Sequence, residues 1–134
     1  MSIEVKRDPS QPMRHIVHIR NHLVSADTSV AEGGADAGPD PHDLYDAALG
    51  ACKALTLVWY AQRKNIPLED VQVKIDRDNS QERQGHYRLA ASIELGGELS
   101  EAQRHELLSV AEKCPVHKLM TSVTTEVTTT LVER

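Results

Sequence analysis

Two cysteines are the residues of this sequence best suited to covalent chemistry. Cys52 lies in an apolar stretch, and Cys114 stands directly before Pro115 and three residues before His117. A thiolate can attack an oxidant and become a sulfenic acid, and a second thiol can then condense with that acid to a disulfide. The pair therefore suggests an oxidant-responsive thiol site. Only the fold decides whether two side chains this far apart in sequence can meet.

Two other interpretations of the same residues remain open. A cysteine on an apolar helical stripe, such as Cys52, is often only a small buried side chain. Cys114 and His117 also form a C-x2-H pair, to which Cys52 and His42 could add two more zinc ligands. The zinc interpretation needs three separate segments to converge, and the sequence has no CxxC motif. We therefore expect neither a metal ion nor a cofactor.

A long helix from Pro41 to about Lys64 is predicted to carry Cys52. Asp40 can cap its first amide groups, and proline suits the first helical position. Apolar residues recur at spacings of three and four and so share one face with the cysteine, flanked by further alanines. These are Leu44, Ala48, Cys52, Leu55 and Trp59. We expect a central helix buried along this face.

The remaining segments predict strands and one more helix. Alternating apolar residues indicate strands near residues 3–7, 15–22, 23–29, 71–75, 87–95 and 123–132. Ser100 and Gln103 fit a capping box, which predicts a helix that ends near Cys114 because Pro115 follows. One further turn is expected over residues 116–120. This order predicts an α+β fold with antiparallel pairing and a single domain spanning residues 1–134.

Composition excludes several classes of function. A net charge of −5 without a basic cluster argues against a nucleic-acid partner, and no apolar run is long enough to cross a membrane. The first nine residues lack the pattern of a signal peptide, so we expect a cytoplasmic protein, in which a cysteine pair is more often reactive than structural. With no Phe and one Trp, the core must be aliphatic, which weakly favours self-association.

Several blocks of the sequence resemble the OsmC/Ohr family of osmotically inducible and organic hydroperoxide resistance proteins. They are the loop Gly33–Pro39, the helical segment Leu44–Cys52 and the segment Ala111–His117, and the order of expected elements is similar along almost the whole chain. The resemblance implies an intertwined homodimer with antiparallel sheets packed around a long central helix. It also implies thiol-dependent reduction of hydroperoxides, preferably organic ones, with a dithiol such as a lipoyl group restoring the thiols.

The resemblance also assigns roles by position. Cys52 matches the peroxidatic cysteine of the family and Cys114 its resolving cysteine. An arginine from the N-terminal strands lowers the thiol pKa in such sites, and Arg14 fits this role best, with Arg20 second. The family's glutamate ten residues before the first cysteine is replaced here by His42, with Asp43 beside it. Asp43 could hold the arginine with a shifted geometry.

This departure leaves two functions open. The first is a peroxidase of the oxidative or osmotic stress response. The second is a non-catalytic stress or ligand-binding member of the same fold. On one straight helix His42 and Cys52 lie about 15 Å apart along the axis. Residues at the helix start can therefore reach the thiol only through a bend or from a second subunit, which a two-fold dimer would supply.

Overall fold

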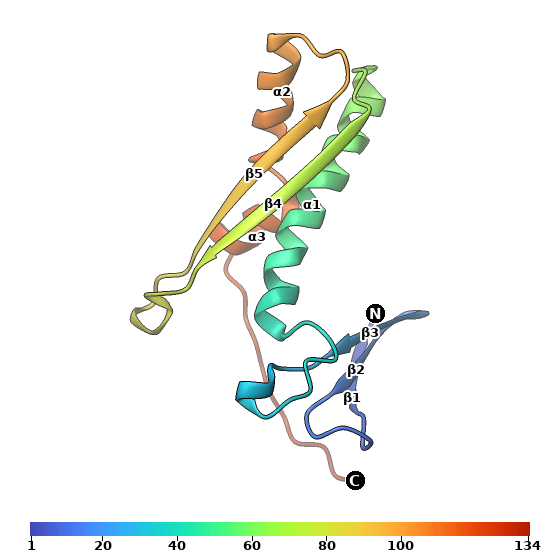
Figure 1. Cartoon of the computed structure of the whole chain (residues 1–134), viewed down its shortest axis with the longest axis vertical. Coiled ribbons are helices and arrows are strands. Elements are labelled where there is room, and N and C mark those ends of the chain that lie inside the picture. Colours follow the sequence, from blue (N-terminus) through green and yellow to red (C-terminus); the bar gives the residue numbers. More distant parts are fainter. The chain divides into compact units, whose positions relative to one another are not determined.

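The computed structural model describes residues 1–134 and divides into two compact units, Met1–Ala47 and Ala48–Arg134. Its helices and antiparallel sheets form an α+β fold, as the sequence predicts (Figure 1). No helix is long and apolar enough to span a membrane.

The N-terminal unit is built on a three-stranded antiparallel sheet. It contains β1 (Ile3–Arg7), β2 (His15–Ile19) and β3 (His22–Ala26) in that order, so β2 is the central strand. β2 and β3 are joined by a tight turn in which Arg20 takes a left-handed conformation with φ of 54°. The two strands predicted near residues 15–22 and 23–29 are present and pair as a hairpin.

The glycine-rich segment after β3 folds closely around Asp27. A short 3-10 helix, η1 (Val30–Glu32), leads into this segment. The Asp27 carboxylate accepts hydrogen bonds from the backbone N–H groups of Thr28, Ala35 and Ala37, at 2.8, 3.3 and 3.0 Å. A Cβ atom at Gly34 would lie only 2.7 Å from the carboxylate oxygen Oδ1, so glycine is needed there for the loop to approach.

Helix α1 (Pro41–Lys64) begins and ends as the sequence predicts. Asp40 accepts the Asp43 N–H at 2.8 Å, and the Asp43 carboxylate accepts the Asp40 N–H at 3.1 Å, so two unpaired backbone donors are satisfied. At the other end Asn65 is left-handed, and the Ile66 N–H bonds to the Ala61 carbonyl. This Schellman-type end satisfies a carbonyl of the last turn.

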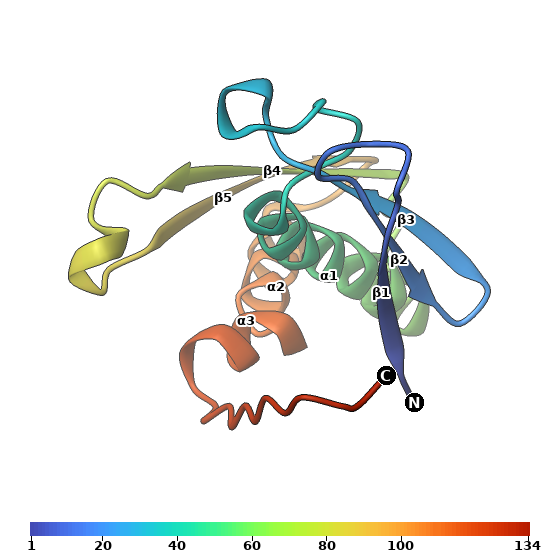
Figure 2. The ribbon, with the colours of Figure 1, turned by 90° about the horizontal axis from the view of Figure 1, so that it is seen from below.

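The C-terminal unit places helices on one face of a two-stranded ribbon. β4 (Asp70–Asp78) pairs with β5 (Arg88–Gly96) through a turn that contains η2 (Glu82–Gln84). Helix α2 (Glu101–Ala111) and the part of α1 from Ala48 onward lie on the same side of the ribbon (Figure 2). A Cβ at Gly50 would lie 3.2 Å from the Ile75 side chain, so this glycine lets α1 approach β4 closely.

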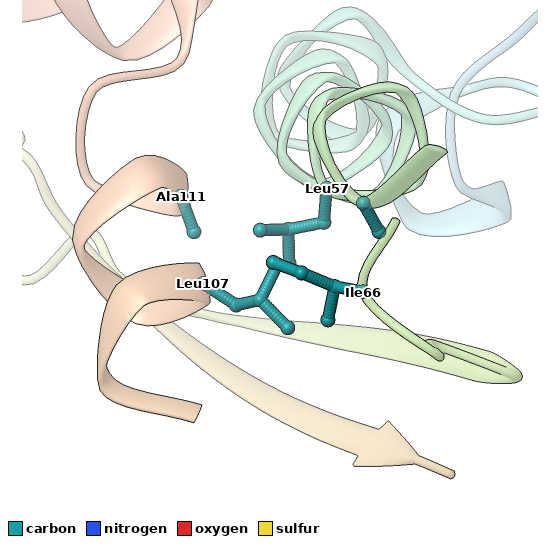
Figure 3. Packing of buried hydrophobic residues seen from close by; sticks show 5 residues of the cluster. Leu57, Ile66, Leu107 and Ala111 are labelled. Carbon is teal, nitrogen blue, oxygen red and sulfur yellow. The ribbon is translucent and has the colours of Figure 1, made fainter. Parts of the chain in front are cut away.

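The core of this unit joins α1, α2 and the segment that follows α1. Leu57 and Leu107 are completely buried and pack with Ala61, Ile66 and Ala111 (Figure 3). Leu95 and Ile93 of β5 pack against this cluster from the ribbon. The predicted capping box of Ser100 and Gln103 is present and begins α2. A short helix, α3 (Pro115–Thr121), occupies the place where one further turn was expected.

The buried face of α1 differs from the predicted one. Within the described chain the buried residues of α1 are Asp46, Leu49, Lys53, Leu57 and Ala61. The predicted face is largely exposed, with Leu55 at 71% and Trp59 at 54% of their full exposure. The helix is apolar on both sides, and the β4–β5 ribbon and α2 cover only the side that contains Leu57. The prediction that α1 is buried along the cysteine face is therefore wrong for the single chain.

The last predicted strand, over residues 123–132, is not formed. No helix or strand follows Thr121, and Val127 and Leu131 are exposed. The segment has the β-branched composition of a strand, but a strand also needs a neighbour to accept and donate its backbone hydrogen bonds. Within this chain no such neighbour pairs with it.

Candidate active site

Cys52 lies near the middle of α1, where its side chain is half-buried. The Val116 N–H, in the first turn of α3, points to its Sγ atom at 3.5 Å. The Thr56 hydroxyl lies one helical turn further along α1, 4.0 Å from the same sulfur. A cysteine sulfur is a weak hydrogen-bond acceptor, so both contacts help to fix the position of Sγ.

Cys114 occupies the junction between α2 and α3 and is completely buried. It is the N-cap residue of α3, and its extended backbone is the conformation that a residue before proline prefers. Burial raises the pKa of the Cys114 thiol, and a side-chain hydrogen bond with Cys52 raises this pKa further. The His117 N–H and the charge of Lys53 act in the opposite direction. Cys114 is thus a neutral thiol in contact with Cys52.

The two thiols, far apart in sequence, meet where α1 passes the start of α3. Both are free in the structure. One sulfur is partly accessible and the other is enclosed, so an oxidant from solvent reaches Cys52 first. A sulfenic acid formed on Cys52 would have the second thiol beside it, which is the arrangement needed for condensation to a disulfide.

A buried lysine adjoins this pair, and the sequence analysis overlooked it. Lys53 is only 4% exposed, and its Nζ donates to the Ala111 carbonyl at 2.8 Å. The same atom lies 3.0 Å from Nδ1 of His117. The spacing along the helix could have indicated that Lys53 is buried, because it stands four residues after Leu49 and four before Leu57. These are the two leucines of α1 that are buried.

A cavity of about 210 Å³ opens beside Lys53 within the C-terminal unit. Its walls are mainly apolar and come from α1, β5 and α2, while Lys53, His117 and Glu112 supply its ionisable groups. The apolar residues are Leu49, Leu89, Ala91, Ile93, Leu108 and Ala111. Neither cysteine lines this cavity, so it is distinct from the sulfur contact.

Arg14 lies in the N-terminal unit and is held there by two hydrogen bonds. Its Nη1 bonds to the Asp8 carboxylate at 2.8 Å and its Nη2 to the Ser25 hydroxyl at 2.7 Å. Its Nε is buried and has no hydrogen-bond partner, which is uncommon for a buried donor. Arg20, the second arginine considered, lies exposed in the β2–β3 turn.

His42 and Asp43 lie in the first turn of α1 and are exposed. Asp43 takes part in the reciprocal bonds with Asp40, so one of its carboxylate oxygens already accepts a hydrogen bond at the helix start. α1 continues without a break from these residues to Cys52, so His42 and Cys52 lie ten residues apart on one helix.

The zinc site considered from the sequence has no support in the structure. No group of three or more His, Cys, Asp or Glu side chains is arranged to hold a metal ion in the described chain. His117 instead directs Nδ1 to the Lys53 ammonium.

Comparisons with known proteins agree with this architecture. Among the solved structures with a similar fold, the match covers 91% of this chain for an OsmC-like protein of Mycoplasma pneumoniae, for the organic hydroperoxide resistance protein OsmC of Legionella pneumophila and for OhrB of Bacillus subtilis. Their sequence identities are 18, 19 and 18%, their TM-scores are 0.73, 0.63 and 0.59, and 87, 90 and 92% of their own chains are covered. No curated protein matches the sequence. The family model described as OsmC-like protein matches residues 33–129, and the chain therefore belongs to the OsmC family.

Proposed function

We propose that this protein is a thiol-dependent peroxidase that reduces organic hydroperoxides in an oxidative or osmotic stress response. The observation that carries the proposal is the contact between Cys52 and Cys114, one partly accessible and one buried. Membership in the OsmC family supports it, as do structural neighbours named for organic hydroperoxide resistance.

The reaction follows from the chemistry of two thiols. The Cys52 thiolate attacks the terminal oxygen of the hydroperoxide, the O–O bond breaks, the hydroxyl group stays on the sulfur, and the alkoxide takes a proton from solvent and leaves as an alcohol. Cys52 is then a sulfenic acid. The Cys114 sulfur attacks the Cys52 sulfur, a disulfide forms and water leaves. A dithiol reductant, such as a lipoyl group, takes the oxidising equivalents by thiol–disulfide exchange and restores both thiols.

The environments of the two sulfurs support this division of roles. Cys52 is accessible to a substrate, and the Val116 N–H lies where it can stabilise a negative sulfur. Cys114 is enclosed, and its raised pKa keeps it a thiol until the sulfenic acid is formed. A buried, protonated sulfur is a poor first nucleophile, because only the thiolate attacks an oxidant efficiently.

Arg14 completes the proposed site as the activating cation. Its buried Nε has an N–H group without a hydrogen-bond partner, and the Asp8 carboxylate orients the other end of the guanidinium group. We assign Asp43 or His42 to positioning this arginine or the substrate. Because α1 is continuous between these residues and Cys52, they would reach the thiol from a second subunit.

The proposal includes a homodimer in which the whole chain, residues 1–134, acts as one domain. The exposed apolar face of α1 is the surface that a second copy would cover. This face consists of Ala48, Ala51, Leu55, Val58 and Trp59. An apolar stripe of this kind on a central helix is typical of an interface between subunits. We place the protein in the cytoplasm, where thiols are kept reduced between turnovers.

A thiol count tests the chemistry. Reduced wild type, treated without oxygen with one equivalent of cumene hydroperoxide, should lose both thiols and release cumyl alcohol. Cys114→Ser should stop at a sulfenic acid that a dimedone probe traps on Cys52, while Cys52→Ser should consume no peroxide. Full turnover by Cys52→Ser would overturn the assignment.

Light scattering tests the dimer. The wild type should have twice the 14.8 kDa chain mass, and Leu55→Glu should have the mass of a single chain. Val30→Glu is the matched control, since Val30 is equally exposed, at 72%, but lies outside the α1 face. A monomeric wild type would contradict the proposal of a dimer without touching the thiol chemistry.

A ligand-binding protein without catalysis is the second candidate. The replacement of the family's glutamate by His42 and the cavity beside Lys53 favour it. Two thiols that stay unreacted in the peroxide experiment, in a stable dimer, would make it the better assignment.

A further inference from the structure

The cavity of the C-terminal unit combines an apolar interior with a buried positive charge. Leucine, isoleucine and alanine side chains from three elements form most of its wall, and the Lys53 side chain lines it. Its volume of about 210 Å³ is below the roughly 300–1,000 Å³ of pockets that hold drug-sized molecules. A ligand of matching size is therefore a small molecule with a short hydrocarbon part.

The charge of Lys53 is the unusual feature of this cavity. Lysine is almost never fully buried unless it is paired, because removing an ammonium group from water is unfavourable. The two partners of Nζ are a carbonyl oxygen and an imidazole nitrogen, and neither carries a negative charge. An ammonium group has three N–H donors, so these two contacts leave one donor.

The only acidic side chain that lines the cavity does not neutralise this lysine. Glu112 is exposed, and neither of the two hydrogen bonds of Nζ goes to it. Its carboxylate is therefore in contact with solvent, where its interaction with charges in the cavity is weakened by water and salt. At the buried end of the cavity, neither hydrogen-bond partner of Lys53 Nζ is a carboxylate.

We propose that this cavity binds a small organic monocarboxylate, with its hydrocarbon part among the apolar walls and its carboxylate at the Lys53 ammonium group. A carboxylate supplies the missing negative charge and accepts the remaining N–H donor. A charge-assisted hydrogen bond of this kind is stronger than a neutral one. The apolar part removes leucine and isoleucine surface from water, which favours a fatty acid of short chain over inorganic anions.

This site goes beyond the proposed peroxidase and does not depend on it. Lys53 follows Cys52 directly in α1, and the His117 backbone N–H bonds to the Cys114 sulfur. Residues of the cavity are therefore attached to both halves of the thiol pair, while the cavity itself excludes both sulfurs. Binding can be measured on the reduced protein without any peroxide.

The first experiment compares two ligands of the same chain length, one with an anionic and one with a neutral polar group. Hexanoate and 1-hexanol are titrated into reduced, full-length ¹⁵N-labelled protein. Hexanoate should shift the amide signals of residues around Lys53 and His117, and 1-hexanol should bind at least tenfold more weakly. Equal affinity of the two ligands, or no shift with hexanoate, would overturn the proposal.

Variants then locate the binding site. Lys53→Met should weaken hexanoate binding by about ten- to a hundredfold, the loss expected for a hydrogen bond to a charged group. Lys74→Met removes an exposed lysine of β4 and should leave affinity unchanged. Glu112→Gln should bind hexanoate equally or more tightly, because it removes a negative charge from the rim. Unchanged affinity in Lys53→Met would refute the role of the lysine.

A second variant keeps the test decisive if Lys53→Met fails to fold. Ala91→Leu enlarges an exposed residue of the cavity wall on β5, and leaves Lys53 in place. It should abolish hexanoate binding by filling the cavity. Retained binding in this variant would show that the ligand lies elsewhere and would overturn the proposal.

Discussion

Replacing Leu107 by alanine tests whether the core of the C-terminal unit is the one described. Leu107 is completely buried between α1 and α2, so the substitution removes three carbon atoms from a packed interior. Buried leucine-to-alanine changes cost about 3–5 kcal/mol, from lost transfer free energy and the cavity left behind. This is a large part of the roughly 5–15 kcal/mol by which proteins of this kind are stable.

The neighbouring leucine provides a matched control. Leu108→Ala has the same change in side chain and in helix propensity, but Leu108 is 52% exposed. With about half of the side chain already in water, the expected loss is below about 1.5 kcal/mol.

Urea unfolding followed by circular dichroism measures both variants. With a slope of about 2 kcal/mol per molar urea, the midpoint should fall by about 2 M for Leu107→Ala and by less than 1 M for Leu108→Ala. Equal shifts, or a larger shift for Leu108→Ala, would refute the packing of α2 described above.

Two further predictions concern the loop around Asp27. Backbone N–H groups, that of Ala37 foremost and then that of Thr28, lower the pKa of this carboxyl below 3.8, so the folded protein binds this proton less readily than the unfolded chain. Asp27 should therefore stabilise the N-terminal unit above about pH 4, and this stabilisation should be lost as the pH falls through the lowered pKa. In NMR titrations the wild type should show an acid transition that Asp27→Asn lacks. Gly34→Ala should loosen the same loop, because the new Cβ would clash with the Thr28 carbonyl and the Asp27 side chain. Amide hydrogen exchange at Ala37 should therefore become faster. Unchanged exchange would contradict the close packing.

Features that depend on neighbouring residues in sequence were predictable. The start of α1 follows from Asp40 and Pro41, and the start of α2 follows from Ser100 and Gln103, since caps act within one turn. The β4–β5 pairing follows from two alternating segments joined by a polar turn. The two cysteines could be recognised as candidates, but sequence alone gave no distance between them.

Features that depend on which surfaces meet were not predictable. α1 is apolar on two sides, so periodicity could not decide which side the ribbon covers, and the count of apolar residues favoured the side of Leu55. Lys53 was overlooked because a charge normally points to solvent. The tail after Thr121 has the composition of a strand, but composition cannot supply the partner that a strand requires.

The contact between Cys52 and Cys114 also means that oxidation of the two thiols would change the stability of the fold. A disulfide here would close a loop of about 60 residues and would reduce the entropy of the unfolded state by the equivalent of about 4 kcal/mol. The oxidised protein would then resist unfolding and proteolysis better than the reduced one. In the proposed peroxidase, a shortage of the dithiol reductant would therefore lead to accumulation of the more stable form, and the lifetime of the protein would depend on the supply of reductant.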